Sequence, residues 1–554
     1  QKNMKRLSFI FLMGLTVAPL TAQETYQSEK LIANDLNGTA RYVGMGGAME
    51  ALGADISTIN TNPAGIGLFR KSQIAVSGGF VAQSNAKTSF SYDNVPFNFK
   101  GDKTNASFDQ AGFVWAKRTG RNSFLNFAFN YHKSKNFDQI LSTAGALSHA
   151  SQNKLSSNKY YGNKLGGGQT TAIDAAYAGT YDNAGNYIPG LMEYYTDKAG
   201  KDVDPSIVTE AGLKDGTYFR HVNYADGQSY RFGQYQHGYI GNYDFNISGN
   251  INDQIYLGLT FGIHDVHYNS DKVYNEVLES NMYSQSWEKM RITGTGFDVK
   301  LGAIFRPIAD SPFRFGIYVN TPVFYDLRLR SSSDVEMGKV GDNGSAATRG
   351  NDVDYDFHLY TPWKFGLSLG HTIGDYLALG FTYEYSDYGS LDNRIDNGDY
   401  YDPVYDVYYD DSSSDDAMND NTKDVLKGVH TLKFGVEYRP IKALSLRLGY
   451  NYVSPKFEEN GFRDQTISSP GTAYATSTDY TNWKCTNRVT AGIGYSFDNF
   501  FMDLAYQYSQ TNGDFYPFQN YPMNVASTSD SNYVSPSSVN FKRHQMLFTI
   551  GYKF

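Results

Sequence analysis

The feature that most constrains the fold is a strict two-residue alternation of apolar with polar or small side chains, repeated along the chain. In the last run, the even-numbered residues from Met546 to Phe554 are all apolar or aromatic, whereas the odd-numbered ones are polar or small, except for Leu547. The same alternation recurs at 255–263, 297–305 and 444–452. It is typical of strands that cross a bilayer with one face in lipid and the other in the lumen of a barrel.

Fourteen such runs can be counted, and the gaps between them alternate in length. Short gaps such as 119–121 and 250–253 are followed by long ones such as 134–236. A soluble sandwich can also alternate its side chains, but it does not sort its loops by parity. We therefore predict an all-β, 14-stranded antiparallel transmembrane β-barrel over 73–554, in a bacterial outer membrane and with both termini periplasmic. The expected strands are 73–83, 107–118, 122–133, 237–249, 254–267, 293–306, 313–329, 355–371, 375–388, 428–439, 443–455, 486–497, 500–511 and 543–554.

Composition excludes several other classes. Among 554 residues, 40% are hydrophobic and 46 are tyrosine, which is far from the signature of disorder. The formal charge of −9 makes nucleic acid a poor partner. The single cysteine, Cys485, cannot form an internal disulfide. If the protein is held in a membrane, its own fold must therefore hold it there.

The start of the chain predicts export. Lys5 and Arg6 precede an apolar stretch from Leu7 to Ala18, and small residues follow up to Ala22. This basic, apolar and small-residue order is that of a secretory signal peptide, which we place at 1–22. No cysteine stands at the expected cleavage point, so a lipid anchor is not expected.

Residues 23–72 are too many for a simple leader to the first strand. They contain Gly44-Met-Gly-Gly-Ala48, then Asp55, then Asn62-Pro-Ala-Gly65. This pattern, over about residues 38–67, closely resembles the N-terminal hatch (plug) of the FadL/TodX family of outer-membrane hydrophobic-compound transporters, and a PorV-like barrel is a relative. The resemblance implies a hatch inside the lumen. It also implies hatch or gating residues, namely Gly44, Gly46, Gly47, Asn62, Pro63 and Ala64.

The same resemblance implies passive uptake of hydrophobic small molecules or lipids, such as long-chain fatty acids, through a hatch-gated barrel. The alternative is a structural or secretion-system partner barrel of the PorV type. Whether Asn62, Pro63 and Ala64 gate the path or only hold the hatch in place stays open, since Asn-Pro also favours a simple turn.

Two long loops stand out. Loop 389–427 carries eleven aspartates against three basic residues, so it is either a solvated loop or a place where divalent cations or lipopolysaccharide bind; its weak metal candidates are Asp410, Asp411, Asp415 and Asp416. Loop 134–236 is too long to lack structure. Helices are expected there at 140–147, from apolar spacing, and after Asp204-Pro205. We read it as a small extracellular cap that could present an apolar groove to the ligand, and that could also bind a protein partner.

No catalytic, cofactor or firm metal site is expected. Gly44-x-Gly46-x-x-Met49 lacks the third glycine of a dinucleotide loop, and Ser84-x-x-Lys87 stands without a supporting motif. His264 and His267 are three apart on a predicted strand and so face opposite sides. The chain is therefore not expected to be an enzyme, and its outer-membrane partners are expected to be lipids and lipopolysaccharide.

Overall fold

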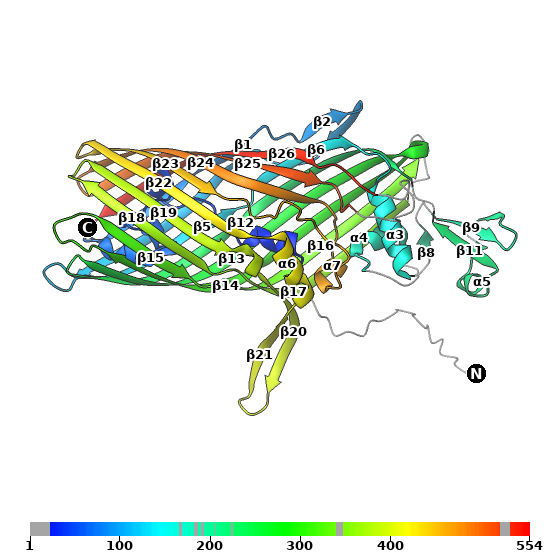
Figure 1. Cartoon of the computed structure of the whole chain (residues 1–554), viewed down its shortest axis with the longest axis horizontal. Coiled ribbons are helices and arrows are strands. Elements are labelled where there is room, and N and C mark those ends of the chain that lie inside the picture. Colours follow the sequence, from blue (N-terminus) through cyan, green and yellow to red (C-terminus); the bar gives the residue numbers. More distant parts are fainter. Residues whose placement is uncertain are drawn as a thin grey trace, which may run out of the picture.

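The computed structural model describes residues 23–164, 169–181, 187–189, 193–204, 207–222, 225–339, 347–520 and 532–554. The predicted signal peptide at 1–22 lies outside these residues. The described chain forms one closed, antiparallel, 14-stranded barrel, as the alternation predicted (Figure 1). The first and last strands pair directly, with Ile74 opposite Tyr552, so the sheet has no free edge at its closure.

Each predicted run coincides with one wall position. The wall strands are β1 (Gln73–Ser84), β4 (Thr104–Arg118), β5 (Phe124–Asn136) continued by β6 (Gln139–Ala146), β12 (Gly227–Ile251), β13 (Ile255–Leu278), β14 (Met282–Phe305), β15 (Arg314–Asn320) continued by β16 (Phe324–Lys339), β17 (Ala347–Tyr360) continued by β18 (Lys364–Ile373), β19 (Leu377–Asp387) continued by β20 (Asp392–Asp402), β22 (Gly428–Ile441), β23 (Leu444–Val453), β24 (Tyr480–Phe497), β25 (Phe500–Tyr516) and β26 (Ser537–Lys553).

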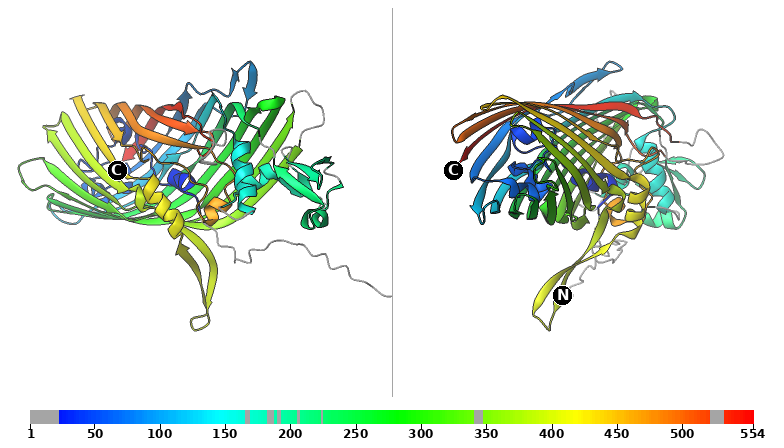
Figure 2. Two further views of the ribbon diagram at one scale, coloured as in Figure 1. Left: turned by 45° about the vertical axis from the view of Figure 1, so that its right-hand side comes forward. Right: turned by 60° about the vertical axis from the view of Figure 1, so that its left-hand side comes forward.

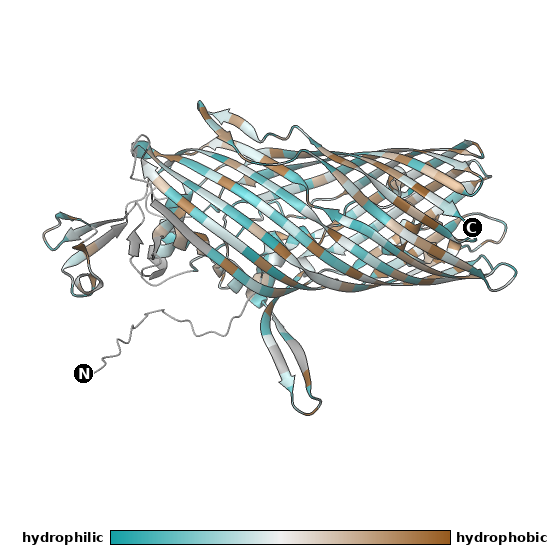
Figure 3. Ribbon diagram, turned by 180° about the vertical axis from the view of Figure 1, so that it is seen from behind, coloured by the Kyte–Doolittle hydropathy of each residue, from teal (hydrophilic) through white to brown (hydrophobic). Residues whose placement is uncertain are grey.

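The two faces of the wall differ as the alternation requires. On β23, Leu446 is 41% exposed on the outside, whereas its neighbour Ser445 is buried inside. On β13, His264 is buried in the lumen and His267 lies on the outer face, so the two do not form one site. Apolar residues gather around the end of the barrel that carries the C-terminus (Figure 3). An exposed apolar band on a closed antiparallel barrel is the architecture of outer-membrane proteins.

Turns and loops separate by end, because consecutive wall strands are antiparallel. The turns at 119–123, 252–254, 306–313, 374–376, 442–443 and 498–499 lie at the C-terminal end of the barrel. The connections on the side of the opposite end, here called the loop end, contain β2 (Ser89–Tyr92), β3 (Val95–Asn98), α3 (Gln152–Lys164), α4 (Ala172–Ala178), β7 (Gly179–Tyr181), β8 (Tyr187–Pro189), β9 (Glu193–Asp197), β10 (Asp202–Val203), α5 (Glu210–Lys214), β11 (Tyr218–Val222), η5 (Glu279–Asn281), β21 (Val407–Ser414), α6 (Asp416–Val425) and α7 (Pro470–Ala473). The short helix η6 (Tyr388–Ser390) lies between β19 and β20.

Two expectations about the loops need correction, and another loop has structure that the sequence did not predict. The helix predicted at 140–147 is wrong: these residues form β6, because β12 extends far enough to offer them a strand edge. The helix predicted from Asp204-Pro205 begins instead at Glu210, where the Thr209 side chain caps it; Pro205 itself lies outside the described residues. Loop 389–427 is largely ordered, since β20 and β21 form a hairpin that projects from the wall, and α6 follows it (Figure 1).

The N-terminal segment (residues 23–72) lies among the wall strands and is almost wholly buried (Figure 2). It contains α1 (Thr25–Ser28), η1 (Glu29–Leu31), α2 (Ala40–Gly44), η2 (Ile56–Asn60) and η3 (Pro63–Leu68). Its hydrogen bonds reach around the wall, to β5, β12, β15, β22 and β26. Within the described residues, no helix has both the length and the apolar character needed to span a membrane.

Candidate functional site

A row of wall glycines seats the N-terminal segment. Gly370, Gly380, Gly435 and Gly449 are direct cross-strand neighbours on β18, β19, β22 and β23. A Cβ at Gly380 would lie 1.9 Å from the carbonyl oxygen of Ala48, and one at Gly449 would lie 2.1 Å from a backbone nitrogen of the segment. Only glycine lets two backbones approach this closely. The alternation pattern indicated small inward residues, but not that these four share one row.

The predicted glycines of the segment belong to this contact. Gly46 and Gly47 have φ angles of +63° and +79°, a backbone conformation that favours glycine. A Cβ on Gly46 would lie 2.8 Å from the backbone nitrogen of Tyr450, and one on Gly44 would lie 3.3 Å from Gly492. These residues therefore press the segment against β22, β23 and β24.

The Asn62-Pro63-Ala64 turn makes a second contact, on another part of the wall. The Asn62 side chain accepts a hydrogen bond from the backbone nitrogen of Ala64 (3.2 Å), and the Pro63 carbonyl accepts one from Ser248 Oγ on β12 (2.8 Å). A Cβ at Gly258 on β13 would lie 2.3 Å from the carbonyl carbon of Pro63. The two predicted clusters are therefore not brought together: each fixes one part of the segment.

Buried ion pairs fasten the segment further. Arg41 Nε lies 3.0 Å from Glu437 of β22, which also pairs with Arg447 of β23 at 2.7 Å. Lys433 Nζ lies 2.8 Å from Glu50, and both side chains are almost wholly buried. Removing one member of such a buried pair leaves the other charge without compensation, which is strongly unfavourable.

The wall itself has an unpaired stretch, here called the seam. β4 and β5 pair only from Gln110–His132 down to Arg118–Phe124. Towards the loop end of that stretch, β4 pairs with β1 alone, whereas the end of β5 and all of β6 pair with β12. Among the described strand pairings, none joins β4 to β5 or β6 there, so neighbouring wall strands lack a hydrogen-bond ladder.

Residues 35–37 of the N-terminal segment occupy the inner side of the seam. The Asp35 backbone nitrogen donates to the carbonyl of Ser134 (2.8 Å), and the Asn136 nitrogen donates to the Asp35 carboxylate (3.0 Å). Asn37 Nδ2 lies 2.9 Å from Asp109 Oδ1 on β4 and 2.9 Å from the Lys133 carbonyl on β5. The segment thus satisfies strand groups that a neighbouring strand would otherwise satisfy.

A cavity of about 240 Å³ lies behind the seam, between the N-terminal segment and the wall. Asp35, Asn37, Asn136 and Phe137 line it on the seam side. Its lining is more polar than the expected cargo suggests, since it includes Lys30, Lys135, Lys364, Lys433, Lys456, Lys484, Arg488 and Arg543. The predicted residues Gly44, Gly46, Gly47, Asn62, Pro63 and Ala64 do not line it.

Arg488 is the cation in this lining that stands out. It is only 9% exposed, yet no carboxylate among the described residues lies within 4.0 Å of it. Nη1 donates to Asn451 Oδ1 (2.8 Å), and Nε has no hydrogen-bond partner within the described chain. By contrast, Arg543 pairs with Asp35 at 3.0 Å. A buried guanidinium that no carboxylate contacts directly is stabilised when an anion binds to it. No sequence pattern marked Arg488, because it is one of several inward basic residues.

The acidic metal candidates are spread over two elements. Asp410 and Asp411 lie on β21 of the projecting hairpin, opposite Asp399 and Gly398. Asp415 caps α6, where it accepts hydrogen bonds from the Met418 nitrogen (3.2 Å) and Ser469 Oγ (2.6 Å), and Asp416 begins that helix. In the part of the chain that the structure describes, no three histidine, cysteine or acidic side chains stand close enough to hold a metal ion.

Comparison with known proteins gave matches among solved structures only. No protein-family model and no curated protein matches the chain. The toluene transporter TodX of P. putida is 11% identical, with 94% of this chain and 99% of that chain covered at a TM-score of 0.46. TbuX of Ralstonia pickettii is 12% identical (94% and 99% covered, TM-score 0.43), and a FadL homologue of Pseudomonas aeruginosa 11% (94% and 100%, TM-score 0.44). At these values the matches carry no argument about function, although the sequence resemblance at residues 38–67 pointed to proteins of the same kind.

Proposed function

We propose that the chain is an outer-membrane channel for passive uptake of hydrophobic small molecules that carry an acidic head, such as long-chain fatty acids. The observation that supports this most is Arg488, a buried cation with no carboxylate of the described residues within 4.0 Å, in a cavity beside the seam. A carboxylate of the cargo would supply the missing anion and a charge-assisted hydrogen bond. In this proposal the loop end is extracellular and both termini are periplasmic.

The seam is the proposed exit. A molecule in the cavity is separated from the outside of the wall by the contacts of Asp35 and Asn37 with β4 and β5. On the outer face, Phe108 and Tyr131 stack at 5.6 Å where the ladder between β4 and β5 ends. One direct bond also spans the seam, from Lys133 Nζ on β5 to Ser107 Oγ on β4 (2.7 Å). Displacing residues 35–37 and breaking this bond would leave a path sideways into lipid without breaking a strand ladder, since none exists there.

The N-terminal segment would then act as a hatch with two kinds of residue. Gly44, Gly46 and the turn at 62–64 hold it to the wall, because their contacts are with wall backbone and not with the cavity. Gly47 supports the segment itself, since a Cβ there would meet the side chains of Leu36, Tyr42 and Lys433. Asp35 and Asn37 gate the path. This assigns the predicted motif residues to support, and the gating role to residues outside the motif.

A binding experiment tests the proposal. Oleate binding to the purified protein is measured for the wild type, for Arg488→Gln, and for Arg330→Gln, an arginine on the outer face. Loss of one charge-assisted hydrogen bond predicts roughly tenfold weaker oleate binding in Arg488→Gln and no change in Arg330→Gln. Oleyl alcohol, which lacks the carboxylate, should bind both variants as it binds the wild type. Unchanged oleate binding in Arg488→Gln would refute the assigned site.

A secretion-system partner barrel is the second candidate function. Part of loop 134–236 forms a projecting sheet, β10–β9–β11, with α5 beside it (Figure 1). It exposes Phe219 (47%) on β11 and Ile207 (57%) between β10 and α5, as a protein-binding surface would. Stable co-purification with another outer-membrane protein, lost when both residues are changed to serine, would favour this candidate. We also propose that the aspartate-rich hairpin of β20 and β21 contacts divalent cations or lipopolysaccharide.

A further inference from the structure

Two cross-strand clusters of tyrosine and histidine on the outer face of the wall have the same geometry. On β19 and β22, His430 lies directly opposite Tyr385, and its Nδ1 is 2.8 Å from the hydroxyl of Tyr383. On β25 and β26, His544 lies opposite Tyr508, and its Nδ1 is 2.7 Å from the hydroxyl of Tyr506. The directly opposed rings are 5.1 Å apart in both, at 46° and 45°.

Each cluster keeps a hydrogen-bond donor for a ligand. If the tyrosine hydroxyl donates to Nδ1, the neutral imidazole carries its proton on Nε2; if Nδ1–H donates, the hydroxyl proton is free instead. In the described chain, Nε2 of His430 has no hydrogen-bond partner, and the residue is exposed. A donor on the outer face of a membrane barrel, among aromatic rings, lies where lipid headgroups are found.

A third pair provides a natural contrast. His267 on β13 lies opposite Tyr239 with the same 5.1 Å ring separation and 46° angle. Here, however, Nε2 lies 2.9 Å from the carboxylate of Asp265. The Asp265 carboxylate occupies the imidazole nitrogen of His267 that could otherwise donate to a ligand, and its charge would repel an anion. This pair therefore has the same ring geometry but cannot bind a phosphate.

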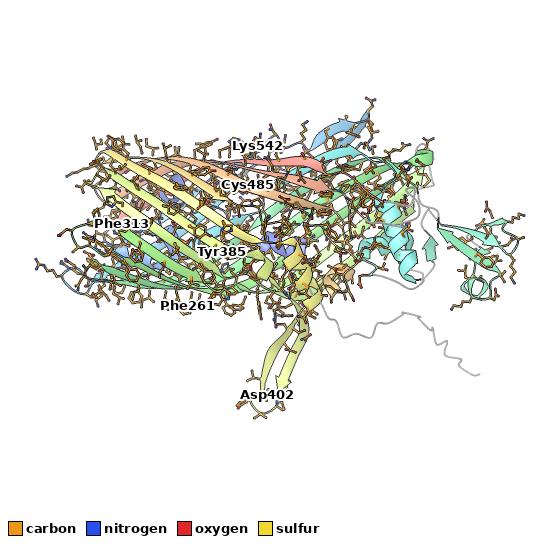
Figure 4. The ribbon with its side chains drawn as sticks, viewed as in Figure 1. Phe261, Phe313, Tyr385, Asp402, Cys485 and Lys542 are labelled. Carbon is orange, nitrogen blue, oxygen red and sulfur yellow. The ribbon has the colours of Figure 1, made fainter. Side chains whose placement is uncertain are left out.

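The first cluster also borders an apolar hollow. A hollow of about 940 Å³ on the outer wall includes Tyr383 and Tyr385 in its lining. It follows a line of cross-strand neighbours, Leu257, Ala303, Ile317, Leu367 and Tyr383. Because barrel strands are tilted by roughly 35–45°, a line across them descends obliquely through the bilayer. Figure 4 labels Tyr385 part-way along the barrel and Phe313 at its turn end.

We propose that Tyr383, Tyr385 and His430 bind the phosphate of an anionic membrane lipid whose acyl chain lies in this hollow. The small side chain of Ala303 leaves room for the chain, while Leu257 and Leu367, 50% and 57% exposed, form its sides. The inference rests on the membrane placement proposed above and not on transport. It gives the protein a lipid site on the outer wall, separate from the lumenal cavity.

Native mass spectrometry with added dioleoyl phosphatidic acid tests this site, with dioleoyl phosphatidylcholine as the comparison lipid. The wild type should retain phosphatidic acid preferentially, and His430→Phe should bind it about tenfold more weakly, because one charge-assisted hydrogen bond is lost. Ala303→Phe, which fills the hollow, should weaken binding as well. His267→Phe is the matched control and should bind as the wild type does.

Equal retention by the wild type and His430→Phe would overturn the proposal. So would an equal loss in His267→Phe, since any interface histidine would then suffice. If His430→Phe fails to fold, Tyr383→Phe removes one hydroxyl from the same cluster and must lower retention. Oleate binding, measured in parallel, separates this result from the proposal for the lumen: His430→Phe should bind oleate normally, and Arg488→Gln should retain phosphatidic acid.

Discussion

Single residues in this barrel matter mostly through close approach of backbones. Four wall glycines leave no space for a Cβ between the sheet and the N-terminal segment, namely Gly370, Gly380, Gly435 and Gly449. The lumen of a barrel of this size is not filled by wall side chains alone, so the segment supplies the packing. Contact of backbone with backbone fixes the segment more rigidly than side chains, which can change rotamer, would do.

Gly380→Ala should therefore destabilise the seated segment. The added Cβ would lie 1.9 Å from the Ala48 carbonyl oxygen, so one backbone must move, which costs about 1–3 kcal/mol for such overpacking. Gly120→Ala, in a turn where the nearest atom is 3.4 Å from the added Cβ, is the control. Thermal unfolding of the two purified variants measures the difference. A Gly380→Ala barrel as stable as Gly120→Ala would show that the segment does not rest on this row.

At the scale of elements, the seam and the N-terminal segment depend on one another. The ends of β4 and β5 are left without a mutual ladder, and Asn37 bonds to both. Hydrogen bonds of this kind contribute roughly 0.5–1.5 kcal/mol each, more where a charged group takes part. A closure held by a few such bonds opens far more often than a strand ladder does.

Asn37→Ala should weaken the contacts that close the seam and leave the contacts between the N-terminal segment and the wall glycines intact. The substitution removes three hydrogen bonds: the two across the seam, one of them to a carboxylate, and one that Asn37 Oδ1 accepts from Gln545 Nε2 of β26 (3.1 Å). The loss predicts opening that is about tenfold more frequent or more. Uptake of a fluorescent fatty acid by proteoliposomes should rise accordingly, with little change in thermal stability. Asn62→Ala is the matched comparison: it removes the cap of η3 and should lower thermal stability without raising uptake. The opposite pattern would make the turn at 62–64 the gate.

The elements also show how far sequence reasoning reaches. Two-residue alternation located every wall strand, because burial on two different faces imposes it along the whole strand. The helix predicted from apolar spacing at 140–147 was wrong, because β12 extends far enough to pair with these residues as β6. The seam and Arg488 were not predicted, since both depend on which strands end beside which, and a single sequence does not record that. The family motif located the segment but not the residues that close the seam.

The whole molecule is a barrel whose lumen and N-terminal segment complement each other in charge as well as shape. Lys433 and Glu437 of the wall each pair with the segment, and Arg543 and Lys135 pair with Asp35. A barrel without the segment would retain its closure by β1 and β26, but it would expose these charges to a water-filled lumen. Water can solvate them, so we expect loss of stability and not loss of the barrel.

Deleting residues 23–72 while keeping 1–22 tests this picture. All wall strands and Phe554 remain, so heat-modifiable migration in gels should still indicate a folded barrel. Conductance in planar bilayers should rise well above that of the intact protein, because the packed lumen becomes an aqueous path lined by Lys433, Arg447 and other charged side chains. Saturable uptake of oleate should fall, since the cavity that holds Arg488 loses its inner wall. The Asn37→Ala protein is the comparison, because it should raise uptake without a large rise in conductance. A deleted barrel with unchanged conductance and unchanged uptake would contradict the gating role of the segment, and would favour the partner-barrel candidate.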